Sequence, residues 1–149
     1  MPQSILIVDD EKGIREALSS ILKDEGYETF SVASGQECLS LLSQRPADLV
    51  LLDVWLEGMD GLETLDRMRE IGIASMVVMI SGHASIETAV KATKLGAFDF
   101  LEKPLSIDKV TVVVKNALEH RRLSLENSRL KAGLSGFAFR WAGNLACPT

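Results

Sequence analysis

Short apolar runs alternate with helical periods along the first 120 residues, and this alternation limits the possible fold more than any other feature. Three of the runs are continuous and rich in β-branched residues: Ile5-Leu6-Ile7-Val8, Leu49-Val50-Leu51-Leu52 and Met76-Val77-Val78-Met79-Ile80. Such runs are typical of interior strands in a parallel sheet, which helices cover on both faces. Two weaker, more alternating segments, 27–32 and 97–101, are expected at the edges of the sheet.

Between the strands, apolar residues recur every three or four positions, as they do along one face of a helix. The stripes are Ile14-Ala17-Leu18-Ile21-Leu22, Ile86-Ala89-Val90-Thr93 and Ile107-Val110-Val114-Ala117-Leu118. Gly26, Gly72 and Gly96 each follow a helical stretch, where a glycine in the left-handed conformation commonly ends a helix. Strict alternation of strand and helix predicts an α/β, doubly wound fold with a five-stranded parallel sheet and five helices.

The composition argues against several classes of function. The 149 residues carry a formal net charge of −5, and the only basic cluster is His120-Arg121-Arg122, so direct binding to nucleic acid is not expected. Cys38 and Cys147 stand in no metal-ligand spacing, and Cys38 is expected to be a small buried residue on a helix. The N-terminus does not resemble a signal peptide, and no apolar run approaches the roughly 20 residues of a membrane span. We therefore expect a cytoplasmic protein without membrane contact.

Chemically reactive residue types follow the strands at the points where they end. Asp9 and Asp10 follow the first strand, Asp53 the third and Ser81 the fourth, while Lys103 follows the fifth. A doubly wound sheet brings these ends together where the strand order reverses, so the five side chains are expected to share one site. Three neighbouring carboxylates repel one another, and Mg²⁺, which prefers oxygen ligands, would compensate their charge.

Each of these residues also has a purely structural interpretation. An Asp at a strand end is often a turn former or a helix cap, and Asp10 could cap a helix that starts near Glu11. Asp60-Gly61 is expected to be a turn and helix start, and His83 an exposed loop residue beside the site rather than a ligand. The joint occurrence of all five groups at strand ends favours chemistry, in which a carboxylate beside Mg²⁺ attacks phosphorus and forms an aspartyl phosphate.

The segments ILIVDDE, LLDVWLEGMDGLETL and VVMISGHASIETAVKATKLGAFDFLEKP closely resemble the receiver domains of bacterial response regulators. The resemblance covers roughly residues 3–120, and its second half is most similar to the nitrogen-regulator class of transcription activators. It implies a flavodoxin-like strand order, 2-1-3-4-5, and a phosphoryl-accepting switch rather than an enzyme. Such a switch assists its own phosphorylation and dephosphorylation, and it receives the phosphoryl group from a sensor histidine kinase or from a small donor such as acetyl phosphate.

The resemblance also implies a set of metal ligands around the phosphoacceptor. Asp53 would accept the phosphoryl group. Asp10 and Asp53 would bind Mg²⁺ directly, Asp9 would bind it through water, and the backbone carbonyl of Trp55 would supply a further ligand. Glu57 stands where the loop often has Pro, a departure that is expected either to loosen the loop or to add charge near the rim of the site.

Further roles follow from the resemblance for the residues that contact the phosphoryl group and respond to it. Lys103 would pair with the phosphoryl oxygens, the Lys103-Pro104 bond would be cis, and Ser81 and Phe100 would form the switch pair. Many members carry Thr in place of Ser81 and Tyr in place of Phe100, so a ring hydroxyl plays no part here. Phosphorylation would shift the population of two conformations and change the face of the fourth helix, fifth strand and fifth helix, the expected homodimer surface.

The expected domain organisation is a receiver at 1–120, a linker helix at 121–132 and a tail at 133–149. Leu118 and Leu125, or Leu123 and Leu130, are seven residues apart, which indicates either a short coiled coil or an extended surface helix. In the family such a helix leads to an ATPase and a DNA-binding domain, and this chain contains the motifs of neither. The tail is expected to be of artificial or altered-frame origin, the alternative being a partner-binding segment.

Three other functions are alternatives to a switch that controls a transcriptional output domain. A stand-alone phosphoryl shuttle would need no output domain and would differ in native gene length. A phosphatase that uses an aspartyl phosphate would resemble a DxD arrangement, but Trp55 occupies the position of its second acid. A degenerate interaction domain would not need the complete set of reactive residues.

Overall fold

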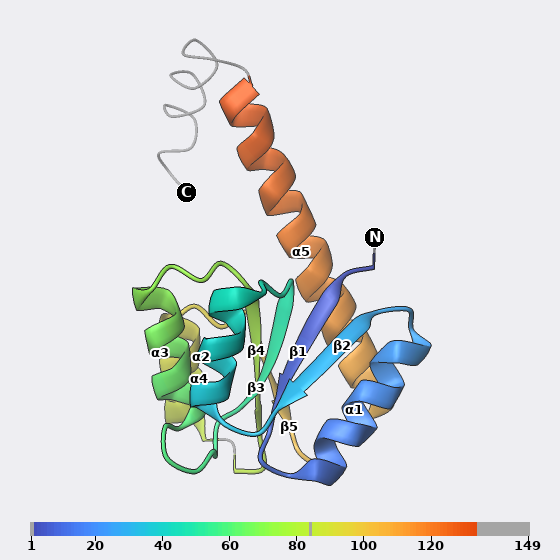
Figure 1. Cartoon of the computed structure of the whole chain (residues 1–149), viewed down its shortest axis with the longest axis vertical. Coiled ribbons are helices and arrows are strands. Elements are labelled where there is room, and N and C mark those ends of the chain that lie inside the picture. The colour runs from blue at the N-terminus through green and yellow to red at the C-terminus, as the bar shows by residue number, and fades with distance from the viewer. Residues whose placement is uncertain (1, 84, 134–149) are drawn as a thin grey trace. The chain divides into compact units, whose positions relative to one another are not determined.

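The computed structural model describes residues 2–83 and 85–133, with side chains described as far as residue 126. The chain divides into two units, the first ending at Leu118 and the second beginning at Glu119. The elements alternate as expected (Figure 1): β1 (Ser4–Val8), α1 (Lys12–Asp24), β2 (Glu28–Val32), α2 (Gly35–Gln44), β3 (Leu49–Asp53), α3 (Gly61–Glu70), β4 (Met76–Ser81), α4 (Ile86–Lys94), β5 (Asp99–Glu102) and α5 (Ile107–Gly133).

The five strands form one parallel sheet in the order β2-β1-β3-β4-β5, which confirms the predicted fold and strand order. The chain runs from β1 outward to β2 and then returns to β3 on the other side of β1. The loops that follow β1 and β3 therefore diverge, and the residues at the carboxyl ends of these two neighbouring strands lie side by side where the strand order reverses.

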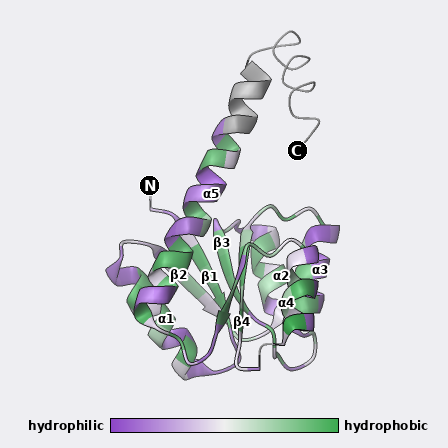
Figure 2. Ribbon diagram, turned by 180° about the vertical axis from the view of Figure 1, so that it is seen from behind, coloured by the Kyte–Doolittle hydropathy of each residue, from purple (hydrophilic) through white to green (hydrophobic). Residues whose placement is uncertain are grey.

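Two apolar layers cover the sheet, one on each face. Alternate residues of β1 point to opposite layers, because successive side chains of a strand face opposite sides. Ile5 and Ile7 pack with α1 and with the part of α5 up to Leu118, while Leu6 and Val8 pack with α2, α3 and α4. In Figure 2 the strands and the inner faces of the helices are largely hydrophobic, whereas polar residues lie on the outer faces. This burial on both faces explains why the central strands read as continuous apolar runs.

The apolar stripe expected on α4 does not pack into the core. Ile86 is 85% exposed and Val90 46%, and the buried residue of this helix is Ala92. Leu95 and Ala97, just beyond the helix, complete its contact with the core. Helix α4 thus packs against the core through Ala92 near its C-terminal end. Its larger apolar residues, Ile86 and Val90, remain on the surface.

The three glycines expected at helix ends do have positive φ, at 94° for Gly26, 81° for Gly72 and 99° for Gly96. Beyond α1, the backbone nitrogens of Gly26 and Tyr27 donate back to the last turn, and those of Gly96 and Ala97 do the same beyond α4. Both helices therefore end in the same hydrogen-bonded turn, whose left-handed position glycine occupies without strain.

The C-terminal expectations are only partly covered by the described residues. The linker at 121–132 stays a prediction, and most of the expected tail, residues 134–149, lies outside the described part of the chain together with Cys147. Cys38 is fully buried on α2, as expected. Among the described residues, no helix has the length and apolar character needed to cross a membrane.

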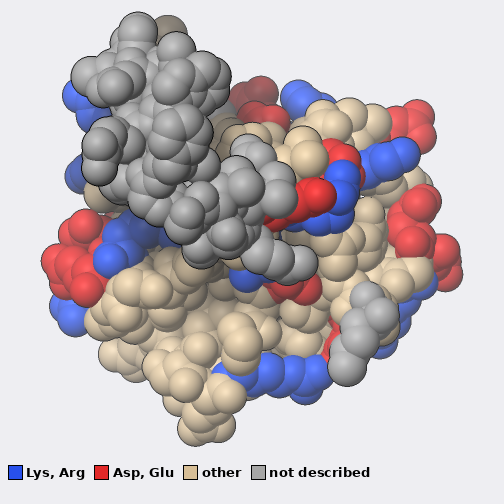
Figure 3. Space-filling view, turned by 90° about the horizontal axis from the view of Figure 1, so that it is seen from above, with Lys and Arg blue, Asp and Glu red and all other residues tan. Residues whose placement is uncertain are grey.

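On the face seen in Figure 3, acidic and basic side chains lie close to one another around the margin.

Candidate functional site

Three carboxylates converge at the ends of β1 and β3. Asp53 is the last residue of β3 and is 2% exposed, Asp9 directly follows β1 and is 1% exposed, and Asp10 is exposed at the rim. One oxygen from each of the three side chains lies within 4.8 Å of the others. The site is therefore acidic, with two of its carboxylates withdrawn from water.

Lys103, which follows β5, places its ammonium group against these acids. Its Nζ lies 3.2 Å from Oδ2 of Asp9, 3.4 Å from Oδ2 of Asp53 and 3.6 Å from Oε1 of Glu11. The lysine side chain is 17% exposed, so water screens these contacts only partly. A single cation thus faces the two buried carboxylates and a third at the surface.

Backbone and side-chain donors orient the two buried carboxylates. The backbone nitrogen of Trp55 donates to Oδ1 of Asp53 at 3.3 Å, and that of Glu11 donates to Oδ1 of Asp9 at 2.9 Å. Arg15, on α1, donates from Nη1 to the backbone carbonyl of Asp9 at 2.7 Å and so ties the loop after β1 to the helix. Both carboxylates therefore have one oxygen fixed by the protein and one directed to Lys103.

Burial and repulsion by Asp9 raise the pKa of Asp53 to about 6, although Lys103 and the Trp55 amide act in the opposite direction. Burial alone lowers the pKa of Lys103, but the neighbouring carboxylates, Asp53 first among them, more than reverse this and raise it. The site therefore holds more negative charge than its lysine balances, and a second cation would stabilise the ionised form of Asp53.

The side chains fit a hard divalent cation. All three acids offer carboxylate oxygens, the ligands that Mg²⁺ prefers, and Asp10 lies at the rim, where water can complete a coordination shell. Oδ2 of Asp9 is buried and accepts no hydrogen bond from the described residues, its contact with Lys103 being an ion pair. A cation would satisfy this oxygen, so the acidic cluster is able to hold a metal ion.

The sequence itself matches a known family over most of the described residues. Residues 5–115 match the family described as the response regulator receiver domain. The chain belongs to this family. Receiver domains are the phosphoryl-accepting modules of two-component signalling.

Individual relatives include longer and shorter proteins. The chain is 44% identical over 130 residues to a putative NtrX-like response regulator of Rickettsia bellii, covering 86% of this chain and 27% of that protein. It is 38% identical to sporulation initiation phosphotransferase F of Bacillus subtilis, covering 79% of this chain and 95% of that protein. The crystal structure of NtrX from Brucella abortus superimposes with a TM-score of 0.82 and 45% identity, covering 87% of this chain and 30% of that one. The chain thus spans under a third of the NtrX-type proteins it matches.

The two expected switch residues of the receiver lie at different depths. Ser81, the last residue of β4, is fully buried, and its Oγ accepts a hydrogen bond from the backbone nitrogen of His83 at 3.0 Å. Its carbonyl accepts from the backbone nitrogen of Lys103 at 2.8 Å, which links the ends of β4 and β5. Phe100, on β5, is half-buried against the layer that contains α4. The Lys103-Pro104 peptide bond is cis.

His83 and Asp60 have the structural roles expected for them, whereas Asp10 does not. His83 is exposed, and its ring meets the 62% exposed ring of Trp55 edge-on with centroids 6.3 Å apart. Asp60 caps α3, since its side chain accepts from the backbone nitrogen of Glu63 at 2.8 Å. Asp10 does not cap α1, because Glu11 occupies the N-cap position. Asp10 is therefore left available to the acidic cluster.

Sequence reasoning missed three residues that shape this site. Glu11 reaches Lys103, and its place directly after the acidic pair was a signal that it belongs there. Arg15 contacts a backbone carbonyl, for which the sequence holds no signal. Gly61 was expected only to start a helix, yet a Cβ at this position would lie 2.1 Å from the carbonyl oxygen of Asp53. Glycine at position 61 thus lets α3 begin directly against the backbone of Asp53.

Proposed function

We propose that Asp53 accepts a phosphoryl group from a sensor histidine kinase and that this reaction switches a transcriptional output domain outside the present chain. The observation that carries the proposal is the ion pair of 3.4 Å between Oδ2 of Asp53 and Nζ of Lys103, beside two further carboxylates. A buried carboxylate with one oxygen held by an amide and the other against a cation is oriented for attack on phosphorus.

The reaction forms a bond between a carboxylate oxygen of Asp53 and phosphorus and breaks the bond from phosphorus to a histidine nitrogen of the kinase. That nitrogen keeps the electron pair and takes up a proton. A pKa of about 6 leaves Asp53 largely ionised near pH 7.5, so the nucleophile needs no base. Lys103 offsets negative charge on the transferred oxygens.

Asp10 and Asp53 are proposed as direct ligands of Mg²⁺, with Asp9 binding through water and the carbonyl of Trp55 adding a ligand. The cation, when bound, supplies positive charge to the phosphoryl oxygens. The same arrangement would admit water for attack on the aspartyl phosphate, so the receiver would assist its own dephosphorylation. The exposed position of Asp10 supports this ligand set, since it leaves room for water at the rim.

The proposed response passes through Ser81 and Phe100 to α4, β5 and the part of α5 before Leu118. The hydroxyl of Ser81 would leave the His83 amide for a phosphoryl oxygen, and the Phe100 ring would change rotamer with it. Exposed apolar residues on this face, Ile86 at 85% and Ile107 at 61%, support its use as a homodimer surface. Light scattering with and without beryllofluoride would test this assembly, and a monomer in both states would contradict it.

The deciding experiment is intact mass after incubation with acetyl phosphate and Mg²⁺. The expected result is one added phosphoryl group in the wild type and none in Asp53→Asn or after chelation. Asp66→Asn, which removes an exposed carboxylate from α3, is the matched control and should be labelled like the wild type. Labelling of Asp53→Asn, or no labelling of the wild type, would refute the assignment.

A phosphoryl shuttle is the second candidate. The specific observation in its favour is the match to nearly the whole length of the Bacillus subtilis phosphotransferase. Transfer of the label from Asp53 onward to a histidine phosphotransfer protein would support a shuttle. Label retained on Asp53, together with assembly through α4, β5 and α5, would support the switch.

A phosphatase is disfavoured, because Trp55 stands where such enzymes need a second acid.

A further inference from the structure

Arg69, near the end of α3, ties the loop that follows its own helix to the C-terminal end of a second helix. Its Nη1 donates to the carbonyls of Ile73 at 3.0 Å and Ser75 at 3.3 Å, both in the loop that leads to β4. Its Nη2 donates to the carbonyl of Gly96 at 3.0 Å, and its Nε lies 3.4 Å from that of Leu95, just beyond α4. One guanidinium thus serves four backbone carbonyls from two separate segments.

The carbonyls at the end of α4 have a particular need for such a donor. The last carbonyls of a helix have no partner within the helix, and they carry the negative end of its dipole. A charged donor satisfies both conditions, and Leu95 is also part of the contact between α4 and the core. Arg69 therefore holds α4 by its C-terminal end.

Gly96 lets the guanidinium approach this closely. A Cβ at position 96 would lie 3.0 Å from Nε of Arg69, and the backbone there has a φ of 99°. Gly26 occupies the equivalent position after α1 with a φ of 94°, and a Cβ there would meet nothing within 4 Å. The two glycines share the same backbone requirement, but only Gly96 also makes room for another residue.

The other end of α4 is held differently. Ser85 caps the helix by accepting from the backbone nitrogen of Thr88, a bond within the helix itself, and the neighbouring Ile86 lies 85% exposed. The buried residue of α4 is Ala92, in its last turn. Local stability rises with burial and with long-range contacts, so the N-terminal end of α4 is less stable than its C-terminal end and moves more readily. The N-terminal end is also the one nearer to Ser81 along the chain.

We propose that Arg69 is a positioning residue of the receiver switch, acting as the pivot of α4. It keeps Leu95 and Gly96 against α3 while the N-terminal end of the helix moves together with Ser81. The inference rests on the proposed phosphorylation of Asp53. Without the pivot, the change at Ser81 spreads along the whole helix instead of being confined to its first turns.

The test combines amide hydrogen exchange with amide NMR spectra of the full chain, with and without Mg²⁺ and beryllofluoride. Arg69→Met removes the donors, and Arg69→Lys keeps the charge and one donor group. Gly96→Ala pushes the guanidinium away from the opposite side. Gly26→Ala is the matched control, since it imposes the same backbone strain at the end of α1.

In the wild type, beryllofluoride is expected to shift the amide signals of 86–90 and to leave those of 95–97 nearly in place. In Arg69→Met and Gly96→Ala, the shifts reach 95–97, and exchange of these amides accelerates about tenfold because a charged hydrogen bond is lost. Arg69→Lys restores part of the wild-type pattern, and Gly26→Ala retains all of it at α4. A role limited to overall stability would not produce this redistribution or its rescue by Lys.

Two results would overturn the pivot. One is a wild type in which beryllofluoride shifts the amides of 95–97 as much as those of 86–90. The other is a folded Arg69→Met or Gly96→Ala whose exchange and shift pattern match the wild type. Intact mass after incubation with acetyl phosphate distinguishes a failure of the pivot from a failure of the proposed phosphorylation of Asp53. An adduct with an unaltered α4 pattern refutes the pivot alone, whereas no adduct in the wild type refutes the phosphorylation and the pivot with it.

Discussion

Replacing Asp53 by Asn is expected to stabilise the fold in the absence of divalent cations. In the wild type, burial and Asp9 raise the native pKa of Asp53 from 3.8 to about 6. Each pKa unit corresponds to about 1.36 kcal/mol, so above pH 6 the ionised carboxylate costs the native state about 3 kcal/mol. An amide avoids this cost and keeps an oxygen for the Trp55 amide, but it points a donor NH2 group toward the Lys103 ammonium, where Asp53 has an acceptor. The expected net gain is therefore about 1–2 kcal/mol.

The sign of the pH dependence follows from the raised pKa. Well below pH 4 Asp53 is protonated in both the native and the unfolded state, so the substitution changes little. Between pH 4 and pH 6 the native state retains a proton that the unfolded state releases, and the stability of the wild type falls as the pH rises. The advantage of Asp53→Asn should therefore be small at pH 4 and complete above pH 6.

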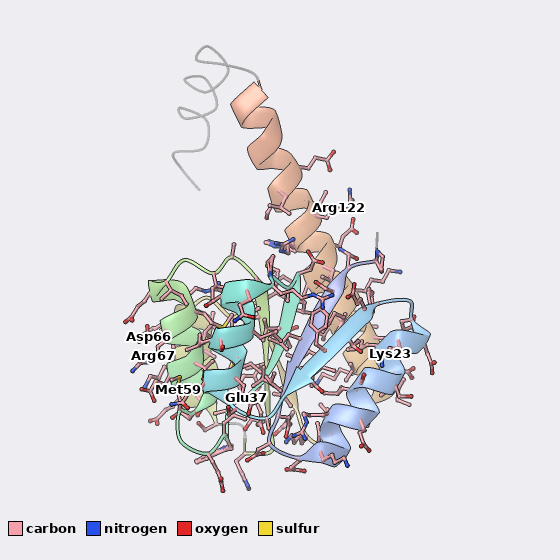
Figure 4. All side chains as sticks on the ribbon, viewed as in Figure 1. Lys23, Glu37, Met59, Asp66, Arg67 and Arg122 are labelled. Atoms are coloured by element: carbon pink, nitrogen blue, oxygen red, sulfur yellow. The ribbon has the colours of Figure 1, made fainter. Side chains whose placement is uncertain are left out.

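Thermal unfolding in chelator at pH 7.5 and pH 4 provides the assay. Asp66→Asn is the control for the loss of one negative charge, because Asp66 is exposed and points outward from α3 (Figure 4). At pH 7.5 the melting temperature of Asp53→Asn should rise by about 4–8 °C, and that of the control should change little. A gain that is absent at pH 7.5, equal at both pH values or matched by the control would refute the electrostatic reasoning.

Three further outcomes are expected. Mg²⁺ at ten times its dissociation constant should stabilise the wild type by about 1.4 kcal/mol and Asp53→Asn hardly at all, as judged by thermal melts; equal stabilisation of both would exclude Asp53 as a ligand. Lys103→Met should abolish rapid labelling by acetyl phosphate and cost about 1–3 kcal/mol in urea unfolding at pH 7.5, because two buried carboxylates lose their cation; unchanged labelling would remove Lys103 from the chemistry. Phe100→Ala should leave the mass adduct on Asp53 intact but weaken beryllofluoride-induced dimerisation about tenfold in light scattering, and equal loss of both would count against a switch role.

The sequence alone determined the sheet and the composition of the site. Strand identity followed from continuous apolar runs, because a strand covered on both faces leaves no polar alternation to obscure it. Asp9, Asp53, Ser81 and Lys103 were found because strand ends in a doubly wound sheet lie together whatever the details of packing. These are properties of local pattern and topology, and both can be read from the chain.

Tertiary packing decided the remaining features. The stripe of Ile86 and Val90 predicted a buried face of α4, but the helix packs through Ala92, since several faces of a short helix carry apolar residues and only docking selects one. The pKa of Asp53 depends on burial and on distances to Asp9 and Lys103 that no spacing reveals. Arg69 meets carbonyls up to 27 residues away in the sequence, and a backbone carbonyl is the same group at every position. Contacts made by such groups are specified only by three-dimensional packing.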